Sequence, residues 1–144
     1  MKETSKREIA AVERACSEIR STGELSEKTR MKLLKLFSKR FENAMTLVEK
    51  NRVKKYMFRP SNRVIWTVLG RKGEYQVIPE TSFCNCDDYY FRVIDRKKTL
   101  CYHIIAQRFA EAFGRHTVKK LPDRAYSSVT EKWKVGEEET QTSE

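Results

Sequence analysis

Residues 84–103 read CNCDDYYFRVIDRKKTLCYH and contain three of the four cysteines and one of the two histidines in the chain. They form two close pairs, Cys84-x-Cys86 and Cys101-x-His103, separated by fourteen residues. A tetrahedral zinc ion takes four such ligands, with sulfur at about 2.3 Å and imidazole nitrogen at about 2.0 to 2.1 Å. Cys84 and Cys86 can face one side of an extended segment, because residues i and i+2 of a strand point the same way. The spacing therefore predicts one structural zinc ion per chain, bound by Cys84, Cys86, Cys101 and His103.

Two other interpretations of these four residues remain. One is a set of reduced core thiols beside an unrelated histidine, and the other is a disulfide, which is rare in the reducing interior of a cell. Two close pairs separated by about the length of a helix favour the zinc site over a chance grouping of core cysteines. Four protein ligands leave no open position for a substrate, which argues against a catalytic metal. The Pro-Cys-x-x-Cys segment of zinc deaminases is also absent from the sequence, so we expect a protein that is not an enzyme.

The composition indicates one basic domain. The chain has 144 residues, of which 39% are hydrophobic and 35% charged, a thin apolar supply that a bound metal would supplement. Formal net charge is +10, and the last nine residues hold four Glu and no Lys or Arg, so the rest of the chain is more basic still. Such a body favours a polyanionic partner, with nucleic acid the first candidate. The candidate nucleic-acid contacts are Lys54, Lys55, Arg71, Lys72, Arg96, Lys97, Lys98, Arg115, Lys119 and Lys120.

The sequence after Met1 lacks the pattern of a secretory signal, because Lys2, Glu3, Lys6 and Arg7 interrupt any apolar run. No uncharged apolar stretch approaches the roughly 18 residues that a membrane span needs. We therefore expect a soluble intracellular protein, in the cytoplasm or the nucleus, with no membrane partner.

The first third of the chain has helical periodicity. Apolar residues three and four apart predict a helix over residues 2–22 that Gly23 can end. Its apolar stripe consists of Ile9, Val12, Cys16 and Ile19. Ser26 can cap a second helix that continues to about Lys50, with room for a bend between Phe37 and Phe41. We expect Cys16 to be a buried small hydrophobe.

The pattern changes to period two near Val53, which predicts a three-stranded antiparallel meander. The alternating residues are Tyr56 and Phe58, then Val64, Trp66 and Val68, then Tyr75 and Val77. Helical spacing returns over residues 100–113 and ends at Gly114. The predicted fold is α+β, with N-terminal helices, the meander and a ββα-like zinc finger that ends in a helix. We expect a helical part at 1–50, the finger region at 51–114 and a basic, then acidic, tail at 115–144 that is disordered from about residue 136.

The two ligand pairs resemble the signature of SWIM-type zinc fingers, Cys-x-Cys, a variable spacer and Cys-x-His. The preceding hairpin fits the same family through Trp66, Val68, Gly70, Tyr75 and Val77. More narrowly, the chain resembles the small SWIM proteins of Shu-type complexes in eukaryotes and archaea, over about residues 40–113. Ala106, three residues after the histidine, matches their pattern, whereas Tyr102 stands where they more often have Lys or Arg.

The resemblance implies an accessory factor in homologous recombination. Such a protein would dock a RecA-family recombinase paralogue and support the recombinase on single-stranded DNA. Candidate docking residues are Ile104, Phe109 and Phe113 on the last helix, or the stripe on the first helix, and either set could instead form the core of the domain. The alternative function is a stand-alone zinc protein that binds nucleic acid without sequence preference.

Overall fold

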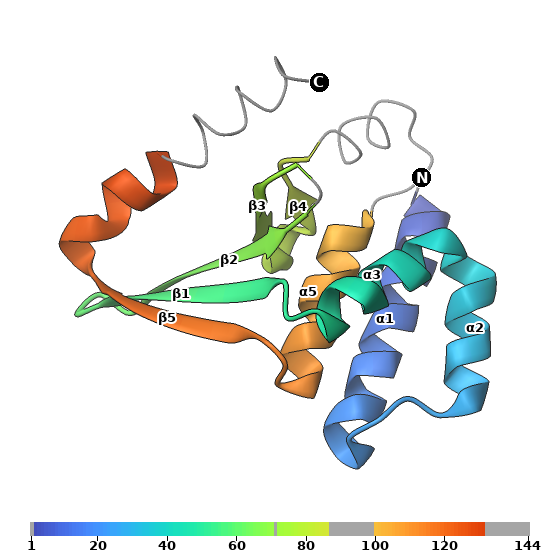
Figure 1. Ribbon diagram of the computed structural model, residues 1–144. Helices are drawn as coiled ribbons and strands as arrows, with labels where there is room; N and C mark the ends of the chain where they lie inside the picture. Colours follow the sequence, from blue (N-terminus) through green and yellow to red (C-terminus); the bar gives the residue numbers. More distant parts are fainter. Residues whose placement is uncertain (1, 71, 87–99, 132–144) are drawn as a thin grey trace.

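The computed structural model describes residues 2–70, 72–86 and 100–131, and its α+β architecture confirms the predicted class (Figure 1). The helices are α1 (Lys2–Thr22), α2 (Glu27–Phe37), α3 (Lys39–Glu49) and α5 (Tyr102–Phe113). The strands are β1 (Val53–Arg59), β2 (Arg63–Leu69), β3 (Glu74–Ile78), β4 (Phe83–Cys84) and β5 (Thr117–Pro122). A helical segment over 126–131 follows a short 3-10 turn at Asp123–Ala125.

The helical half follows the sequence, and its second helix is interrupted within the bend allowed between Phe37 and Phe41. The helix expected to continue from Ser26 to about Lys50 is two helices, because Ser38 adopts a φ of 54° between α2 and α3. The backbone N–H of Ser38 donates to the carbonyl of Leu34 and closes α2. The break lets Phe37 and Phe41 both enter the core, each with 3% of its surface exposed. Among the described residues, no helix is long and apolar enough to cross a membrane.

The predicted meander is the centre of a larger sheet with the order β4-β3-β2-β1-β5. β1, β2 and β3 pair antiparallel, with Tyr56 opposite Ile65 and Trp66 opposite Val77. Two strands were not predicted: β4 is only two residues long, and β5 pairs parallel to β1. Within the expected tail at 115–144, a polar edge strand and a helical segment form over residues 117–131, and no structure was predicted there. The expected disorder from residue 136 lies outside the described residues.

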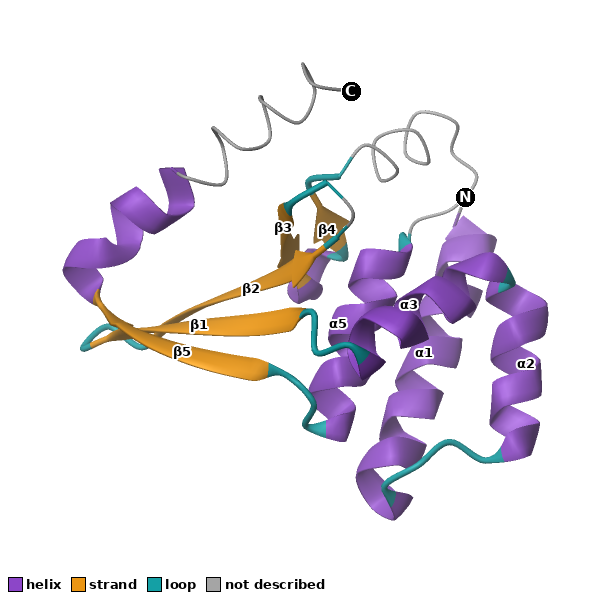
Figure 2. Cartoon of the chain, in the orientation of Figure 1, coloured by secondary structure: helices purple, strands orange, loops and turns teal. Residues whose placement is uncertain are grey.

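The core has a large and a small part on opposite faces of the sheet. The large part lies between α1, α3, α5 and one sheet face, and Figure 2 shows α5 between the other helices and the strands. Val53, Trp66, Val68 and Val77 supply that face. The small part has Tyr56, Phe58 and Ile65 at its centre, packed against Leu121, Tyr126 and Val129. The segment after α5 thus covers the second face of the sheet.

Candidate metal centre

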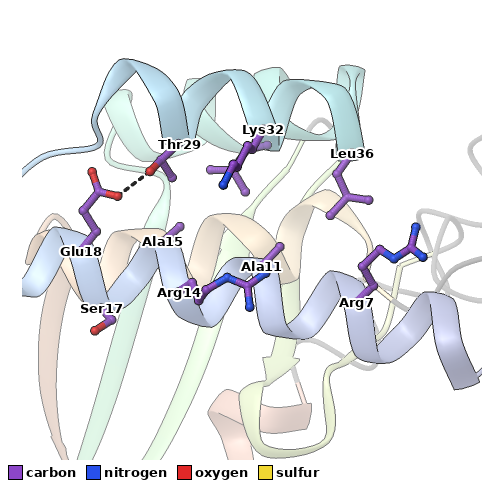
Figure 3. A pocket seen from close by; sticks show the side chains of 10 residues that line it. Arg7, Ala11, Arg14, Ala15, Ser17, Glu18, Thr29, Lys32 and Leu36 are labelled. Atoms are coloured by element: carbon purple, nitrogen blue, oxygen red, sulfur yellow. Dashed lines mark hydrogen bonds between the residues drawn. The ribbon is translucent and has the colours of Figure 1, made fainter.

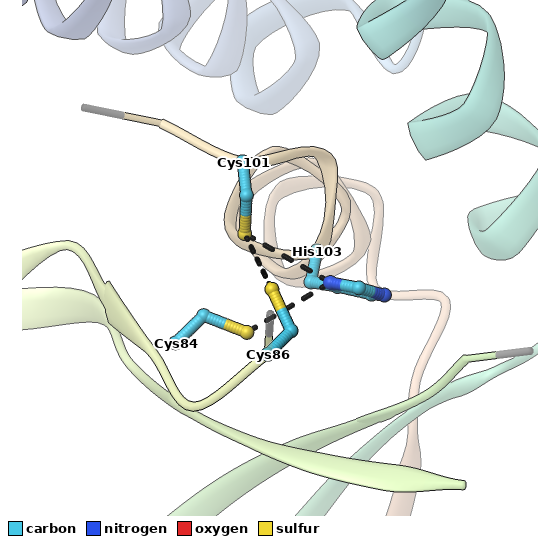
Figure 4. A group of neighbouring side chains, drawn as sticks. All are labelled: Cys84, Cys86, Cys101 and His103. Carbon is cyan, nitrogen blue, oxygen red and sulfur yellow. Dashed lines mark hydrogen bonds between the residues drawn. The ribbon is translucent and has the colours of Figure 1, made fainter. Parts of the chain in front are cut away.

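The four predicted zinc ligands meet between the sheet and the start of α5 (Figure 4). Cys84 ends β4 and Cys86 follows it by two residues, so their side chains leave the same end of the sheet. Cys101 is the N-cap of α5, and His103 lies in the first turn of that helix. All four are buried, with at most 3% of their surface exposed. A strand end and a helix start therefore bring together two ligand pairs that are far apart in sequence.

The separations between ligand atoms match tetrahedral zinc. The distance is 3.8 Å from Cys86 Sγ to Cys101 Sγ, and also 3.8 Å from each of Cys84 Sγ and Cys101 Sγ to His103 Nδ1. Two sulfurs at about 2.3 Å from a tetrahedral centre lie about 3.8 Å apart. All four donor atoms lie within 4.8 Å of one another. The site fits one zinc ion, ligated by His103 through Nδ1.

The pKa shifts of the three buried thiols are those of a site that a bound cation would stabilise. Hydrogen bonds with Cys101 and Cys86, together with burial, raise the pKa of Cys84. Hydrogen bonds from Cys101 and Cys84 lower the pKa of Cys86, whereas burial raises the pKa of Cys101. Without a metal, burial thus opposes ionisation of Cys84 and Cys101. A divalent ion stabilises all three thiolates, and such ligation contributes directly to folding.

The imidazole of His103 is tightly enclosed by its neighbours. The rings of Tyr75 and Tyr102 lie 4.8 Å and 4.3 Å from its ring, measured between centroids. A Cβ atom on Gly70 would lie 2.9 Å from Nε2 of His103 and 2.6 Å from the Tyr75 ring. Only glycine therefore fits at position 70 without displacing the histidine or the tyrosine. The sequence predicts that Gly70 and Tyr75 belong to the hairpin, but it does not predict their contact with His103.

A buried ion pair supports the same end of α5, and sequence reasoning missed it. Arg40 Nη2 donates to Glu8 Oε2 at 2.8 Å, and the two side chains are only 6% and 2% exposed. Arg40 Nη1 also donates to the backbone carbonyl of Leu100 at 2.6 Å. Because Leu100 precedes Cys101, this arginine fixes the backbone that carries a zinc ligand. The signal available in the sequence was weak, since one Glu and one Arg among many give no pattern.

Six of the ten predicted nucleic-acid contacts lie among the described residues, at the β2–β3 hairpin, after α5 and on two strands. Lys72 and Arg115 are exposed, and Arg71, Arg96, Lys97 and Lys98 lie outside the described residues. Paired strands β1 and β5 carry the other four lysines.

Two of these four lysines lie on each face of the sheet. Tyr56 pairs with Lys119 and Met57 with Lys120, so strand alternation places Lys54 and Lys119 on the face of Tyr56. Lys55 and Lys120 are on the opposite face, where Lys55 Nζ lies 5.4 Å from the Trp66 ring centroid.

The predicted docking residues belong mainly to the core. Ile104 and Phe109 are 0% exposed, so their assignment to a partner surface is wrong for this fold. The reason is that α5 packs on the sheet and on two helices at once. Phe113 is half-buried against the same core. In the alternative stripe on α1, Val12, Cys16 and Ile19 are buried, and Ile9 packs against them.

The comparison with known proteins agrees with this site. The chain is 31% identical over 109 residues to a protein of Dictyostelium discoideum named zinc finger SWIM domain-containing protein 7 homolog. The match covers 74% of this chain and 70% of the relative. The chain belongs to the SWIM zinc-finger family. No family model matches this SWIM protein, and no solved structure gives a significant match.

Proposed function

We propose that this SWIM protein is a non-enzymatic accessory factor in homologous recombination. It docks a RecA-family recombinase paralogue and supports the recombinase on single-stranded DNA. The recombination role rests on the resemblance to small SWIM proteins of Shu-type complexes.

The closed coordination of the metal is the observation that most favours a binding role. Cys84, Cys86, Cys101 and His103 supply four buried donors at tetrahedral spacing. A zinc ion held by four protein ligands has no exchangeable position for water or substrate. The zinc would therefore shape the surface that meets a partner, by fixing the end of the sheet against α5.

Reconstitution with a recombinase paralogue tests the proposal. The full chain would be co-expressed with the RecA-family paralogues of the same genome, and each product sized by light scattering after gel filtration. We expect a stable heteromeric complex with one of them, and a longer lifetime of recombinase filaments on single-stranded DNA when the complex is added. Normal filament lifetimes with every complex, or no complex with any paralogue, would refute the proposal.

Stand-alone binding of nucleic acid is the second candidate, favoured by the exposed lysines of β5. Lys119 and Lys120 are both exposed on an edge strand that lies beside Lys54 and Lys55. Their contribution would appear as a salt-dependent affinity, because each neutralised phosphate adds about 0.7 to the slope of log K against log salt on single strands.

A matched pair of double variants tests this second candidate. Lys119→Gln with Lys120→Gln should lower the salt slope on an oligo-dT strand. Lys35→Gln with Lys39→Gln, which changes two exposed lysines on α2 and α3, should not. Equal slopes in both double variants would mean that the strand lysines are not the contact.

A further inference from the structure

A groove lies between α1 and α2 (Figure 3). In Figure 1 these two helices lie on the opposite side of α5 from the strands. Its volume is about 440 Å³. The lining residues are Arg7, Ala11, Arg14, Ala15, Ser17 and Glu18 of α1 with Thr29, Lys32, Leu33 and Leu36 of α2. Ala15 and Leu33 at the bottom of the groove are buried in the larger core, and Ala11 and Leu36 pack against that core while keeping part of their surface exposed.

One end of the groove is held closed by hydrogen bonds. The Thr29 hydroxyl and the backbone N–H of Ser26 both donate to the carboxylate of Glu18. These bonds join the helices beside the loop that connects them. Figure 3 shows Glu18 and Thr29 at this end, with Arg7 and Leu36 at the other. The groove is therefore a built feature with a fixed end.

The charges in the groove are unbalanced. Among the described residues, Arg7, Arg14 and Lys32 have no ion pair. Glu18 is the one carboxylate in the lining, and its hydrogen bonds with Thr29 and Ser26 lower its pKa. Three cations thus face a site whose single anion is already engaged by the protein. Such a groove is complementary to a negatively charged ligand.

The floor of the groove is aliphatic and has helical spacing. Ala11 and Ala15 are four residues apart on α1, and Leu33 and Leu36 are three apart on α2. Ala15 and Leu33 are buried, and the partly exposed Ala11 and Leu36 above them leave a shallow apolar strip that fits the side-chain ridge of a third helix. The lining contains no aromatic ring on which a base could stack. These features favour a polypeptide over a nucleic acid.

We propose that the groove between α1 and α2 docks an amphipathic helix of a protein partner, with acidic residues flanking an apolar face. The apolar face lies on the exposed parts of Ala11 and Leu36, and carboxylates pair with the cations at the rim. This inference rests on the proposed function, in which the chain docks another protein, and it replaces the docking residues expected on α5.

A model peptide tests the chemistry of the groove directly. The probe is a helix of about 18 residues, or five turns, with Leu and Ala on one face and Glu at the other positions. We expect it to bind the zinc-loaded full chain and to shift the backbone amide signals of Ala11 and Ala15. The same peptide with Lys in place of Glu should not bind.

Charge reversal and filling of the groove identify the contact. Arg14→Glu with Lys32→Glu should weaken peptide binding by at least about tenfold. Lys39→Glu with Arg124→Glu, which changes net charge equally at exposed positions outside the groove, should have less than about a twofold effect. Ala11→Phe, which fills the floor, should abolish binding while the circular dichroism spectrum stays that of the folded chain.

Several outcomes would overturn the groove proposal. One is an equal loss of peptide binding in the two charge-reversed double variants. Another is unchanged peptide binding by the Ala11→Phe variant. The third is binding of the Lys peptide as tight as that of the Glu peptide. Binding of an oligo-dT strand that depends on Arg14 and Lys32, with no binding of the Glu peptide, would assign the groove to nucleic acid instead.

The recombinase paralogue separates this proposal from the proposed function. A paralogue complex that the groove variants leave intact would contradict the groove proposal and retain the accessory role. Peptide binding in the groove, with no paralogue that binds the chain, would retain the groove and contradict the accessory role.

Discussion

His103 is positioned by contacts on every side of its ring. Nδ1 faces the cysteine sulfurs, the rings of Tyr75 and Tyr102 lie within 5 Å by centroid, and Gly70 lies beside Nε2. A zinc ligand confined in this way has little rotamer freedom to lose when the metal binds. The metal site therefore depends on a residue, Gly70, that cannot itself bind a metal.

Gly70→Ala should weaken the zinc site. The added methyl would overlap the ring of Tyr75 and approach Nε2 of His103 to 2.9 Å, and overpacking of this kind costs about 1 to 3 kcal/mol. We expect a lower midpoint in urea and faster transfer of zinc to a chromogenic chelator. In the control, Gly23→Ala, the methyl meets nothing within 4 Å but is strained by a φ of 89°, so stability should fall without faster zinc release. Unchanged zinc transfer in Gly70→Ala would contradict the enclosure of His103.

Cys16 should make stability fall at alkaline pH. Burial raises the pKa of its thiol to about 11, whereas an exposed cysteine has a pKa of about 8.5. The unfolded chain therefore loses this proton first, and stability decreases as pH rises from about 8.5 to about 11. Urea unfolding of the wild type and of Cys16→Ala across this range should show a steeper decline in the wild type. Parallel declines would mean that Cys16 is not buried.

Sequence reasoning succeeded at this scale where the chemistry is local. Two close ligand pairs identified the zinc set, because thiols and imidazoles at metal spacing have few other uses. The ion pair between Glu8 and Arg40 was not predicted. The two residues are 32 positions apart, and charged residues of these types are usually expected at the surface. Ile104 and Phe109 were misassigned because periodicity identifies an apolar face but not what covers it.

At the scale of elements, the first turn of α5 connects the metal site to the helices. Arg40 on α3 binds Glu8 on α1 and the carbonyl that precedes Cys101. Three elements are thus joined by one guanidinium. Replacing a whole buried ion pair by apolar residues is often close to neutral for stability, whereas removing one partner leaves a buried, unpaired charge.

Arg40→Met should destabilise the chain by about 3 to 5 kcal/mol, because it leaves the Glu8 carboxylate buried and unpaired. Glu8→Met should have a similar effect, because it leaves the Arg40 guanidinium buried without its carboxylate partner. The double variant should lose much less than the sum of the two, as measured by urea unfolding in a double-mutant cycle. Additive losses would show that the two side chains do not interact in solution.

The sheet shows which elements the sequence can predict. β1, β2 and β3 were visible because alternating apolar residues meet turn residues. β5 was not visible, because its residues TVKKLP are mostly exposed and its partner lies some 60 residues earlier in the chain. A parallel edge strand is defined by that distant partner and not by its own pattern.

Tyr126→Ala should destabilise the chain by about 2 kcal/mol through loss of the smaller core. The Tyr126 ring lies 5.1 Å from that of Phe58, and the guanidinium of Arg63 lies 4.3 Å from its centroid. Tyr126→Phe keeps the ring and should be close to the wild type, and both variants should keep one zinc per chain. Equal stability of the Ala and Phe variants would show that residues 123–131 do not cover the sheet.

For the whole molecule, zinc joins the end of the sheet to α5 at one edge of the larger core. Cys84 and Cys86 belong to the end of the sheet, whereas Cys101 and His103 belong to α5, around which the larger core is built. Only 39% of the chain is hydrophobic. Structural zinc can supply on the order of 10 kcal/mol of folding free energy. We therefore expect the whole fold to be lost when the zinc ion is removed.

The most direct test is native mass spectrometry of the purified chain, before and after a strong chelator, with circular dichroism on the same samples. We predict one zinc ion per chain and a large loss of ordered secondary structure once it is removed. Cys101→Ser should reproduce the chelated state. A chain that carries no metal and keeps its full spectrum, or that loses zinc without any change in the spectrum, would contradict the structural zinc site.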